Sequence, residues 1–329
     1  MRLAVTIDVE EEGLFSSRYE PGNAPVRNVV ELKRLDPVFR EWDIRPTLMI
    51  AYQVIRTAEH RDLLLALRET WNGEIGAHLH PWNTPPLETL PYPEPVPSEL
   101  MRRELLAAKL GTLCDALHAM GVDPVSFRMG RFNIGPKIFS LLEEIGVRVD
   151  SSIAPMRRYY GGPAHLSAPV DPYFPDPQEL CSPGSSPILE VPMTILPLIP
   201  RLGAVLDRIG DAGLVPGSWI SWFSMNLGSL PAQPAWTGLN RLKAAVRLHQ
   251  ARRGRVLSVF FHSSELLPGG SPLHPGTDAV GRFLNKLDRF FSWLKREITV
   301  ESQTLSELCD SYEHPGGAGG TTTTEGRTS

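Results

Sequence analysis

The chain has 329 residues, of which 42% are hydrophobic, so it can bury one large core or two smaller ones. Its formal net charge of -4 gives no electrostatic reason to expect nucleic acid or an anionic membrane as a partner. Three widely separated cysteines, Cys114, Cys181 and Cys309, form neither a readable disulfide framework nor a C-x-x-C metal site, which favours a reducing cytosol.

The N-terminus lacks the basic and apolar regions of a secretory signal, and no stretch reaches the roughly 18 uninterrupted apolar residues of a membrane-spanning helix. We therefore expect a cytoplasmic protein without a membrane span. Residues 313–329 are rich in Gly and Thr and almost free of apolar residues, so we expect a disordered tail there.

Strand-like and helix-like patterns alternate along the first half of the chain. The expected strands are 2–9, 46–50, 74–80, 125–129 and 147–150. The expected helices are 29–42, 61–70, a long amphipathic helix with Ser98 as its N-cap, and one with Pro136 in its first turn and Gly146 just past its end. This alternation is typical of parallel sheets with crossover helices.

Residues 154–233 interrupt the alternation because they are dense in Pro, Gly and Ser, and only 188–193 has a convincing strand pattern. We expect an elaborated loop region inside a single domain that spans 1–312. The elements expected after it are helix 239–252, strand 256–261, helix 277–296, strand 298–300 and a last helix whose capping box pairs Thr304 with Glu307.

About seven or eight strands with intervening helices predict an α/β protein, a distorted (β/α) barrel rather than an open doubly wound sheet. No G-x-G-x-x-G or Walker pattern supports a nucleotide site.

Two histidines stand at the end of the third expected strand. The alternation in Glu74 to Trp82 puts His78 and His80 on one face, and Pro81 ends the strand just after them. Two imidazoles and a carboxylate are a common catalytic set for zinc or a similar divalent ion. The pair therefore predicts a metal site, with ordinary core or surface histidines as the alternative.

The first strand supplies carboxylates in the same way. Asp8 and Glu10 share a face at its end, and the apolar residues beside them indicate a buried strand. Glu11 and Glu12 are expected to be a solvated continuation. Arg128, Asp150 and His262 also end expected strands, and a barrel assembles its active site at that end.

These motifs resemble the polysaccharide deacetylases (NodB homology, carbohydrate esterase family 4-like). The resemblance rests on Thr6 to Glu10, Gly76 to His80, Phe127 to Arg131 and Phe261-His262, and it spans most of residues 1 to 312. It implies a distorted (β/α) barrel, one divalent metal ion bound by an acidic residue and two histidines, and hydrolysis of an N-acetyl or related amide. Zinc is the expected metal, with cobalt, nickel and manganese as alternatives.

By position, the resemblance makes Asp8 the catalytic base, Arg128 the residue that orients it, and His262 the catalytic acid. Glu10 and His78 become metal ligands. Substrate-binding roles are expected for Trp82, Arg131 and Asp150, with a structural role as the alternative for Trp82.

The chain departs from the common pattern at two places. Common members carry adjacent aspartates, whereas this chain has Asp8-Val9-Glu10, and Asp8 and Glu10 could exchange roles. Their histidines usually lie four residues apart, but position 82 is Trp82, so His80 must serve as the second ligand.

We expect a metal-dependent deacetylase that acts on a sugar, an oligosaccharide or a glycan precursor. The alternatives are a hydrolase of small non-sugar amides and a catalytically silent glycan-binding protein. An amidohydrolase-type barrel also uses H-x-H, but on its first strand, which here carries carboxylates.

Overall fold

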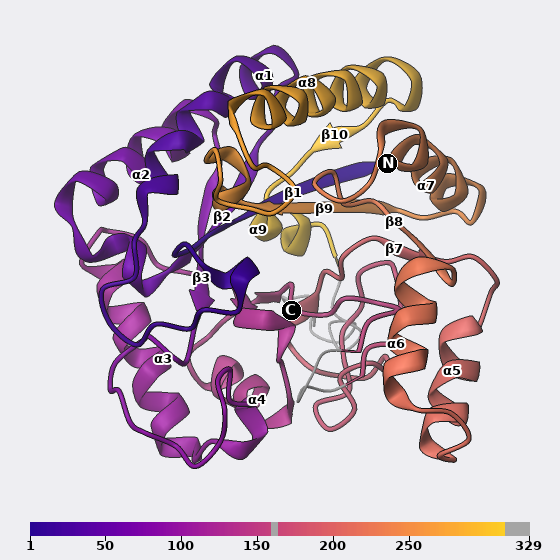
Figure 1. Cartoon of the computed structure of the whole chain (residues 1–329), viewed down its shortest axis with the longest axis horizontal. Coiled ribbons are helices and arrows are strands. Elements are labelled where there is room, and N and C mark those ends of the chain that lie inside the picture. The colour runs from indigo at the N-terminus through magenta and orange to yellow at the C-terminus, as the bar shows by residue number, and fades with distance from the viewer. Residues whose placement is uncertain (159–163, 313–329) are drawn as a thin grey trace, which may run out of the picture.

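The computed structural model describes residues 1–158 and 164–312, in which an eight-stranded sheet curls into an open barrel with helices outside it (Figure 1). Its strands are β1 (Arg2–Val9), β2 (Pro46–Ala51), β3 (Glu74–Leu79), β4 (Ser126–Met129), β5 (Val149–Asp150), β6 (Leu189–Glu190), β9 (Val256–His262) and β10 (Glu301–Ser302). All the pairings within this sheet are parallel. The predicted α/β class and distorted (β/α) barrel are confirmed. The predicted tail, 313–329, lies outside the described residues.

The strand order places the ends of distant strands together. Strands β1 to β6 pair in chain order, and β9 returns to the free side of β1 with Asp8 opposite His262. Thr194 bridges the open side of the barrel between β6 and β9, where its N–H donates to the Ser258 carbonyl at 3.1 Å. The Ser258 N–H in turn donates to the Thr194 hydroxyl at 2.8 Å. The carboxyl ends of the strands therefore surround one opening.

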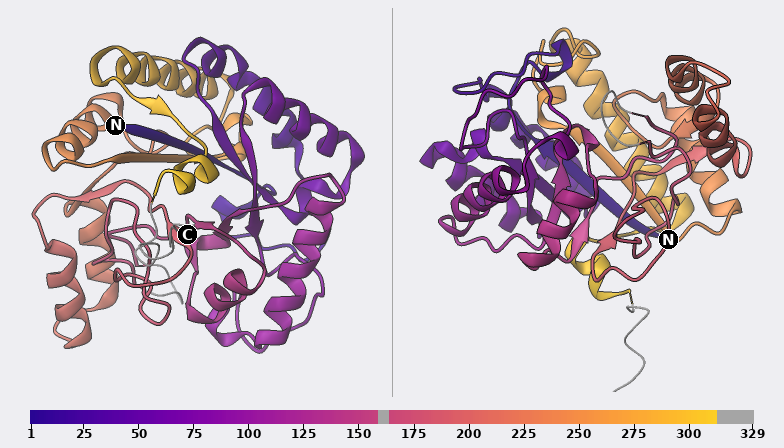
Figure 2. Two further views of the ribbon diagram at one scale, coloured as in Figure 1. Left: turned by 180° about the vertical axis from the view of Figure 1, so that it is seen from behind. Right: turned by 90° about the horizontal axis from the view of Figure 1, so that it is seen from below.

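Most of the helices lie on the outer face of the sheet, but the last one packs Leu305 and Leu308 against residues that point into the barrel, such as Ala4 (Figure 2). The helices are α1 (Asp36–Glu41), α2 (Ala58–Thr70), α3 (Arg103–His118), α4 (Pro136–Glu144), α5 (Leu202–Asp211), α6 (Gly217–Asn226), α7 (Leu239–Ala251), α8 (Thr277–Trp293) and α9 (Leu305–Asp310). Leu3, Val5, Ile7 and Val9 of β1 belong to the same buried apolar cluster as Phe290 of α8. The alternate residues of β1 therefore point into the barrel. Within the described ranges, every helix is too short or too polar to cross a bilayer.

The start of α3 differs from the prediction. Ser98 is not the N-cap of the long helix, because Met101 and Arg102 are extended (ψ 150° and 143°) and α3 begins only at Arg103. Ser98 instead begins a short 3-10 helix, and its buried hydroxyl donates to the Asn133 carbonyl at 2.8 Å. The capping box of Thr304 and Glu307 before α9 is confirmed.

Two further expected elements are displaced. Residues 27–35 form a 3-10 helix before α1 rather than one helix over 29–42. The last strand is Glu301–Ser302 rather than 298–300, because the chain after α8 continues to Ile298 as a π-helix.

The segment 154–233 is more regular than a loop region. It holds α5 and α6, and β7 (Ile195–Pro197) pairs with β8 (Ser229–Pro231) as an antiparallel ribbon. Figure 1 shows α5 and α6 side by side as a pair at the edge of the molecule. The helical period of α6 is hidden in the sequence because large apolar residues occupy its exposed as well as its buried side.

Candidate metal centre and active site

Six of the predicted site residues converge inside the carboxyl end of the barrel. Asp8 and Glu10 come from β1 and the turn after it, His78 and His80 from the end of β3, Arg128 from β4 and His262 from β9. All are at most 4% exposed except His262, whose side chain is 12% exposed. Burial of so many ionisable groups in one place is costly unless they neutralise one another or bind an ion.

The atoms of the predicted metal ligands face one another. The Nε2 atoms of His78 and His80 lie 2.9 Å apart, and each is 3.3 Å from Oε2 of Glu10. Ligand bonds of about 2.0–2.1 Å in a tetrahedral zinc site place ligand atoms roughly 3.4 Å apart. The three side chains therefore fit a single divalent ion, and His80 does reach the position that its displaced spacing requires.

Each imidazole is oriented through its other nitrogen. Nδ1 of His78 donates to the backbone carbonyl of Arg128 at 3.0 Å, and Nδ1 of His80 donates to the Glu11 carboxylate at 2.9 Å. With those protons on Nδ1, both Nε2 atoms present lone pairs to the Glu10 carboxylate. Neutral rings would leave three acceptors facing one another, so either a metal ion or an added proton must lie between them.

The charge around these ligands also favours a cation. Burial acts to raise the pKa of Glu10, but His262, His78 and His80 outweigh it and hold that pKa below its usual value. For His80, burial would lower the pKa, yet the carboxylates of Glu11 and Glu10 raise it to about 10. The carboxylates of Glu10 and Glu11 therefore stabilise a positive charge at this point.

Glu11 corrects one expectation. It is not a solvated residue, because it is 1% exposed and accepts hydrogen bonds from His80 and, at 2.8 Å, from the indole N–H of Trp82. β1 ends at Val9, and the turn after it brings Glu11 to the side of the histidines. Glu12 instead pairs with Arg27 at 2.6 Å.

Asp8 is held by Arg128. The buried guanidinium donates to Oδ1 of Asp8, to the Thr6 hydroxyl at 2.9 Å and to the carbonyl and hydroxyl of Ser151 at 2.8 and 2.9 Å. Since its donors are used in this way, the guanidinium fixes one oxygen of Asp8 and leaves Oδ2 directed at the histidines, 4.0 Å from Nε2 of His78.

His262 lies on the opposite side of the same carboxylates. Its Nε2 is 3.9 Å from Oδ2 of Asp8 and 3.9 Å from Oε1 of Glu10. Burial acts to lower the pKa of His262, but Glu10 and Glu265 outweigh it and raise the pKa to about 9. In the metal-free protein these carboxylates favour the protonated ring, which can donate a proton.

A cavity of about 360 Å³ opens over this centre. The apolar side chains of Phe15, Met225 and Trp236 line the cavity, and so does Arg131. Arg131 has φ 58° and Phe132 φ 55°, a left-handed backbone that non-glycine residues rarely adopt and that is often kept at functional sites.

Two of the expected substrate-binding residues do not line this cavity. Trp82 stacks on the His80 ring, with ring centres 4.2 Å apart, and is 4% exposed. Asp150 is buried behind the site, where the Ser152 hydroxyl donates to it at 2.5 Å and burial raises its pKa.

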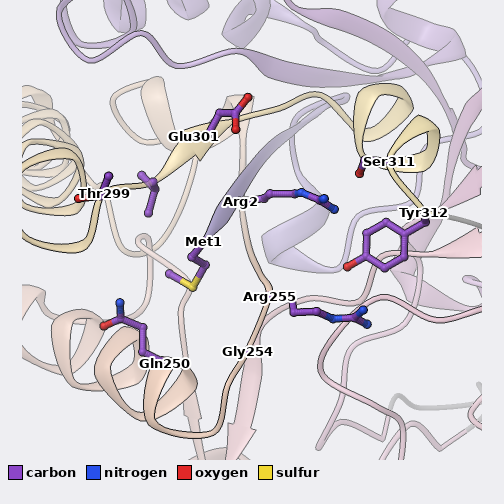
Figure 3. A pocket seen from close by; sticks show the side chains of 10 residues that line it. Met1, Arg2, Gln250, Gly254, Arg255, Thr299, Glu301, Ser311 and Tyr312 are labelled. Carbon is purple, nitrogen blue, oxygen red and sulfur yellow. The ribbon is translucent and has the colours of Figure 1, made fainter.

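A second, larger cavity of about 990 Å³ lies at the other end of the barrel, beside Met1 and Glu301 (Figure 3). Arg2 and Arg255 place their guanidinium carbons 5.4 and 5.1 Å from the centre of the Tyr312 ring. None of its described lining residues is a histidine or cysteine, and the groups of described residues that could hold a metal ion lie at the cavity over β1 and β3.

Sequence reasoning missed the residues that hold the ligands from behind. Asn28 donates to the Glu10 carbonyl at 2.9 Å and to the Ser263 hydroxyl at 2.7 Å. A Cβ on Gly130 would lie 2.5 Å from Cδ2 of His80, so this position requires glycine. The close approach at Gly130 depends on the pairing of β3 with β4, which no local pattern reveals.

No family model matches the sequence, and no curated protein matches it significantly. Solved structures do match. A candidate polysaccharide deacetylase from Mycobacterium smegmatis has a TM-score of 0.55 at 17% identity, over 94% of this chain and 89% of that one. A candidate glycoside hydrolase/deacetylase from Parabacteroides distasonis has a TM-score of 0.61 at 12% identity, over 94% and 70%.

A third structure, 4-alpha-glucanotransferase from Thermococcus litoralis, has a TM-score of 0.53 at 12% identity, over 95% of this chain and 40% of that one. At these identities the likeness concerns the fold. The chain therefore has the barrel fold found in the structures described as polysaccharide deacetylases, and the same fold occurs in a glucanotransferase.

Proposed function

We propose that this protein is a metal-dependent hydrolase of the polysaccharide deacetylase family that removes an N-acetyl group from a sugar, an oligosaccharide or a glycan precursor. The observation that carries the proposal is the convergence of Glu10, His78 and His80, with both Nε2 atoms aimed at one carboxylate. Asp8 and His262 flank this trio on the cavity side.

In the proposed site Glu10, His78 and His80 hold one divalent ion, with zinc as the first candidate and cobalt, nickel and manganese as alternatives. Such an ion polarises the amide carbonyl and lowers the pKa of a coordinated water. Glu11 and the Arg128 carbonyl keep the imidazoles in the tautomer that binds a metal.

The remaining residues move protons. Asp8, oriented by Arg128, takes a proton from the attacking water as the water oxygen bonds to the carbonyl carbon. His262 gives a proton to the amide nitrogen as the C–N bond breaks, so the products are acetate and a free amino sugar. The apolar walls of the cavity limit water around the reacting group.

The test is acetate release from a panel of N-acetylated mono- and oligosaccharides after the apoprotein is reloaded with zinc, cobalt, nickel or manganese. The expected result is metal-dependent release that is lost in His78→Ala and in Asp8→Asn. His118→Ala is the matched control, because His118 lies on the surface at the end of α3 and pairs with Asp123.

Activity that survives both chelation and His78→Ala would contradict the proposal. If the protein hydrolysed small non-sugar amides in a metal-dependent way but released acetate from no sugar, the same reaction would have a different class of substrate. Sugar binding without metal and without turnover would identify a silent glycan-binding protein.

A further inference from the structure

Large apolar side chains are exposed mainly in one region. Nine of the fifteen strongly exposed large hydrophobic residues among the described ranges fall within residues 198–236, around α5 and α6. We define the α6 patch as Leu198, Ile199, Trp219, Trp222, Met225 and Leu227, which are 47 to 65% exposed. Leu198 adjoins the end of α6 because its N–H donates to the Gly228 carbonyl at 3.0 Å. A concentration of this kind marks an interaction surface.

The orientation of α6 exposes its tryptophans. Ile220 and Ser224 face the protein and are buried, whereas Trp219, Trp222 and Met225 follow one another at three-residue spacing on the outer face. An exposed helix normally turns its polar face to water and its apolar face inward. In α6 the outer face is as apolar as the inner one.

This region also lacks charge. No Asp, Glu, Lys or Arg occurs in the 29 residues from 212 to 240, whereas 21% of the whole chain is charged. An uncharged surface of aliphatic residues and tryptophan is not a site for sugar rings alone, because leucine and isoleucine offer no face for sugar stacking. It suits the boundary between water and lipid, where tryptophan is enriched.

The patch is continuous with the active-site cavity. Met225 belongs to the patch and also lines the cavity, and Trp236, which is 46% exposed, lines it too. A protein partner seated on the patch would sit against this opening and obstruct it. A lipid surface would instead present a substrate to it, and the exposed Arg131 and Arg158 at the same cavity would meet the phosphate groups of lipids.

We propose that the α6 patch binds the surface of a lipid bilayer, so that the active site acts on an N-acetyl sugar carried by a phosphate-linked lipid. The substrate part of this proposal rests on the proposed function. The helix lies in the interface and does not span the bilayer, and binding depends on burial of apolar side chains more than on lipid charge.

The test is co-sedimentation of the full chain with phosphatidylcholine vesicles, with and without phosphatidylglycerol. The wild-type protein is expected to sediment with both. In the double variant Trp219→Ser/Trp222→Ser, binding should fall by at least about tenfold. The matched control, Leu100→Ser/Ile145→Ser, removes two equally exposed apolar residues outside the patch (49 and 48%) and should bind as the wild type does.

Thermal midpoint and bound metal are measured for every variant and should be unchanged, and Trp222→Ser alone serves as a milder second variant. Wild-type protein that stays in the supernatant with both vesicle types would overturn the proposal. So would an equal loss in the control variant, or a vesicle-free dimer that the double variant abolishes, since a second copy would then cover the patch. These measurements need no turnover, so their failure is separate from failure of the hydrolase proposal.

Discussion

The Glu11 carboxylate accepts the Nδ1 proton of His80 at 2.9 Å, and this contact turns the ring so that its Nε2 faces His78 and Glu10. Glu11 is thus a positioning residue. Glu11→Gln removes the negative charge beside Nδ1 of His80 and should lower the affinity for a metal ion about 10- to 100-fold. Titration of the apoprotein with zinc measures the effect.

The neighbouring Glu12 provides the control for that experiment. Glu12 pairs with Arg27 outside the centre, so Glu12→Gln should bind zinc as the wild type does. Equal affinity in Glu11→Gln and wild type would mean that the Glu11 contact does not organise a metal ligand.

Arg128 and Asp8 form an ion pair with almost no access to water. Arg128→Met leaves the Asp8 carboxylate buried without its partner and should lower the free energy of unfolding of the metal-free protein by about 3–5 kcal/mol. The double variant Asp8→Asn/Arg128→Met should lose less, because no charge is then stranded. Urea unfolding of the two single variants, Asp8→Asn and Arg128→Met, and of the double variant measures the coupling. If the effects of the single variants simply added up in the double variant, the two residues would not be coupled.

Gly130 has no room for a side chain beside His80. In Gly130→Ala the new methyl group would meet Cδ2 of His80 at 2.5 Å and the Leu79 carbonyl at 2.7 Å, so either the ligand or the strand end must shift. We expect weaker zinc binding and a lower thermal midpoint.

Gly111 is the matched glycine for this experiment. It lies within α3 with no atom near the position of a new Cβ. Gly111→Ala should stabilise the protein by up to about 1 kcal/mol and leave zinc binding unchanged. If Gly130→Ala behaved like Gly111→Ala, the close packing against His80 would be refuted.

His165 makes stability depend on pH. It is fully buried, its Nδ1 accepts from the Ala154 N–H at 3.2 Å, and burial lowers its pKa from 6.5 to about 4. Below pH 6.5, His165 binds a proton in the unfolded chain but stays neutral in the folded chain. The free energy of unfolding therefore falls as the pH drops from about 6.5 to about 4. The loss is at most about 3 kcal/mol.

His165→Asn keeps an acceptor but cannot titrate, so its unfolding free energy should change less with pH than that of the wild type over this interval. Urea unfolding at a series of pH values measures the difference. Parallel pH profiles for the two proteins would exclude His165 as the source.

The barrel was predictable because its strands are short apolar runs that end in polar residues, as in 2–9 and 74–80. The same alternation placed Asp8 with Glu10 and His78 with His80 on shared faces, and the structure brings all four together. Local periodicity contains this information because a strand fixes the direction of alternate side chains.

Other features depend on contacts between distant segments. Glu11 lies beyond the end of β1, where alternation no longer applies, and its partner His80 is 69 residues away. Asn28 contacts Ser263, which is 235 residues away in the sequence, and Asp150 packs behind the site instead of lining it. The α5 and α6 pair went unpredicted because Pro, Gly and Ser surround it and its exposed face is apolar.

Arg128 donates to four oxygen atoms from different parts of the sheet: one each on Thr6 and Asp8 of β1, and two on Ser151 after β5. A single guanidinium therefore links the Asp8 carboxylate to the curvature of the barrel. Variants that loosen these hydrogen bonds to accommodate a new substrate should also have a lower thermal midpoint. Broader specificity in this scaffold is consequently more accessible through the cavity walls and the α6 region than through its centre.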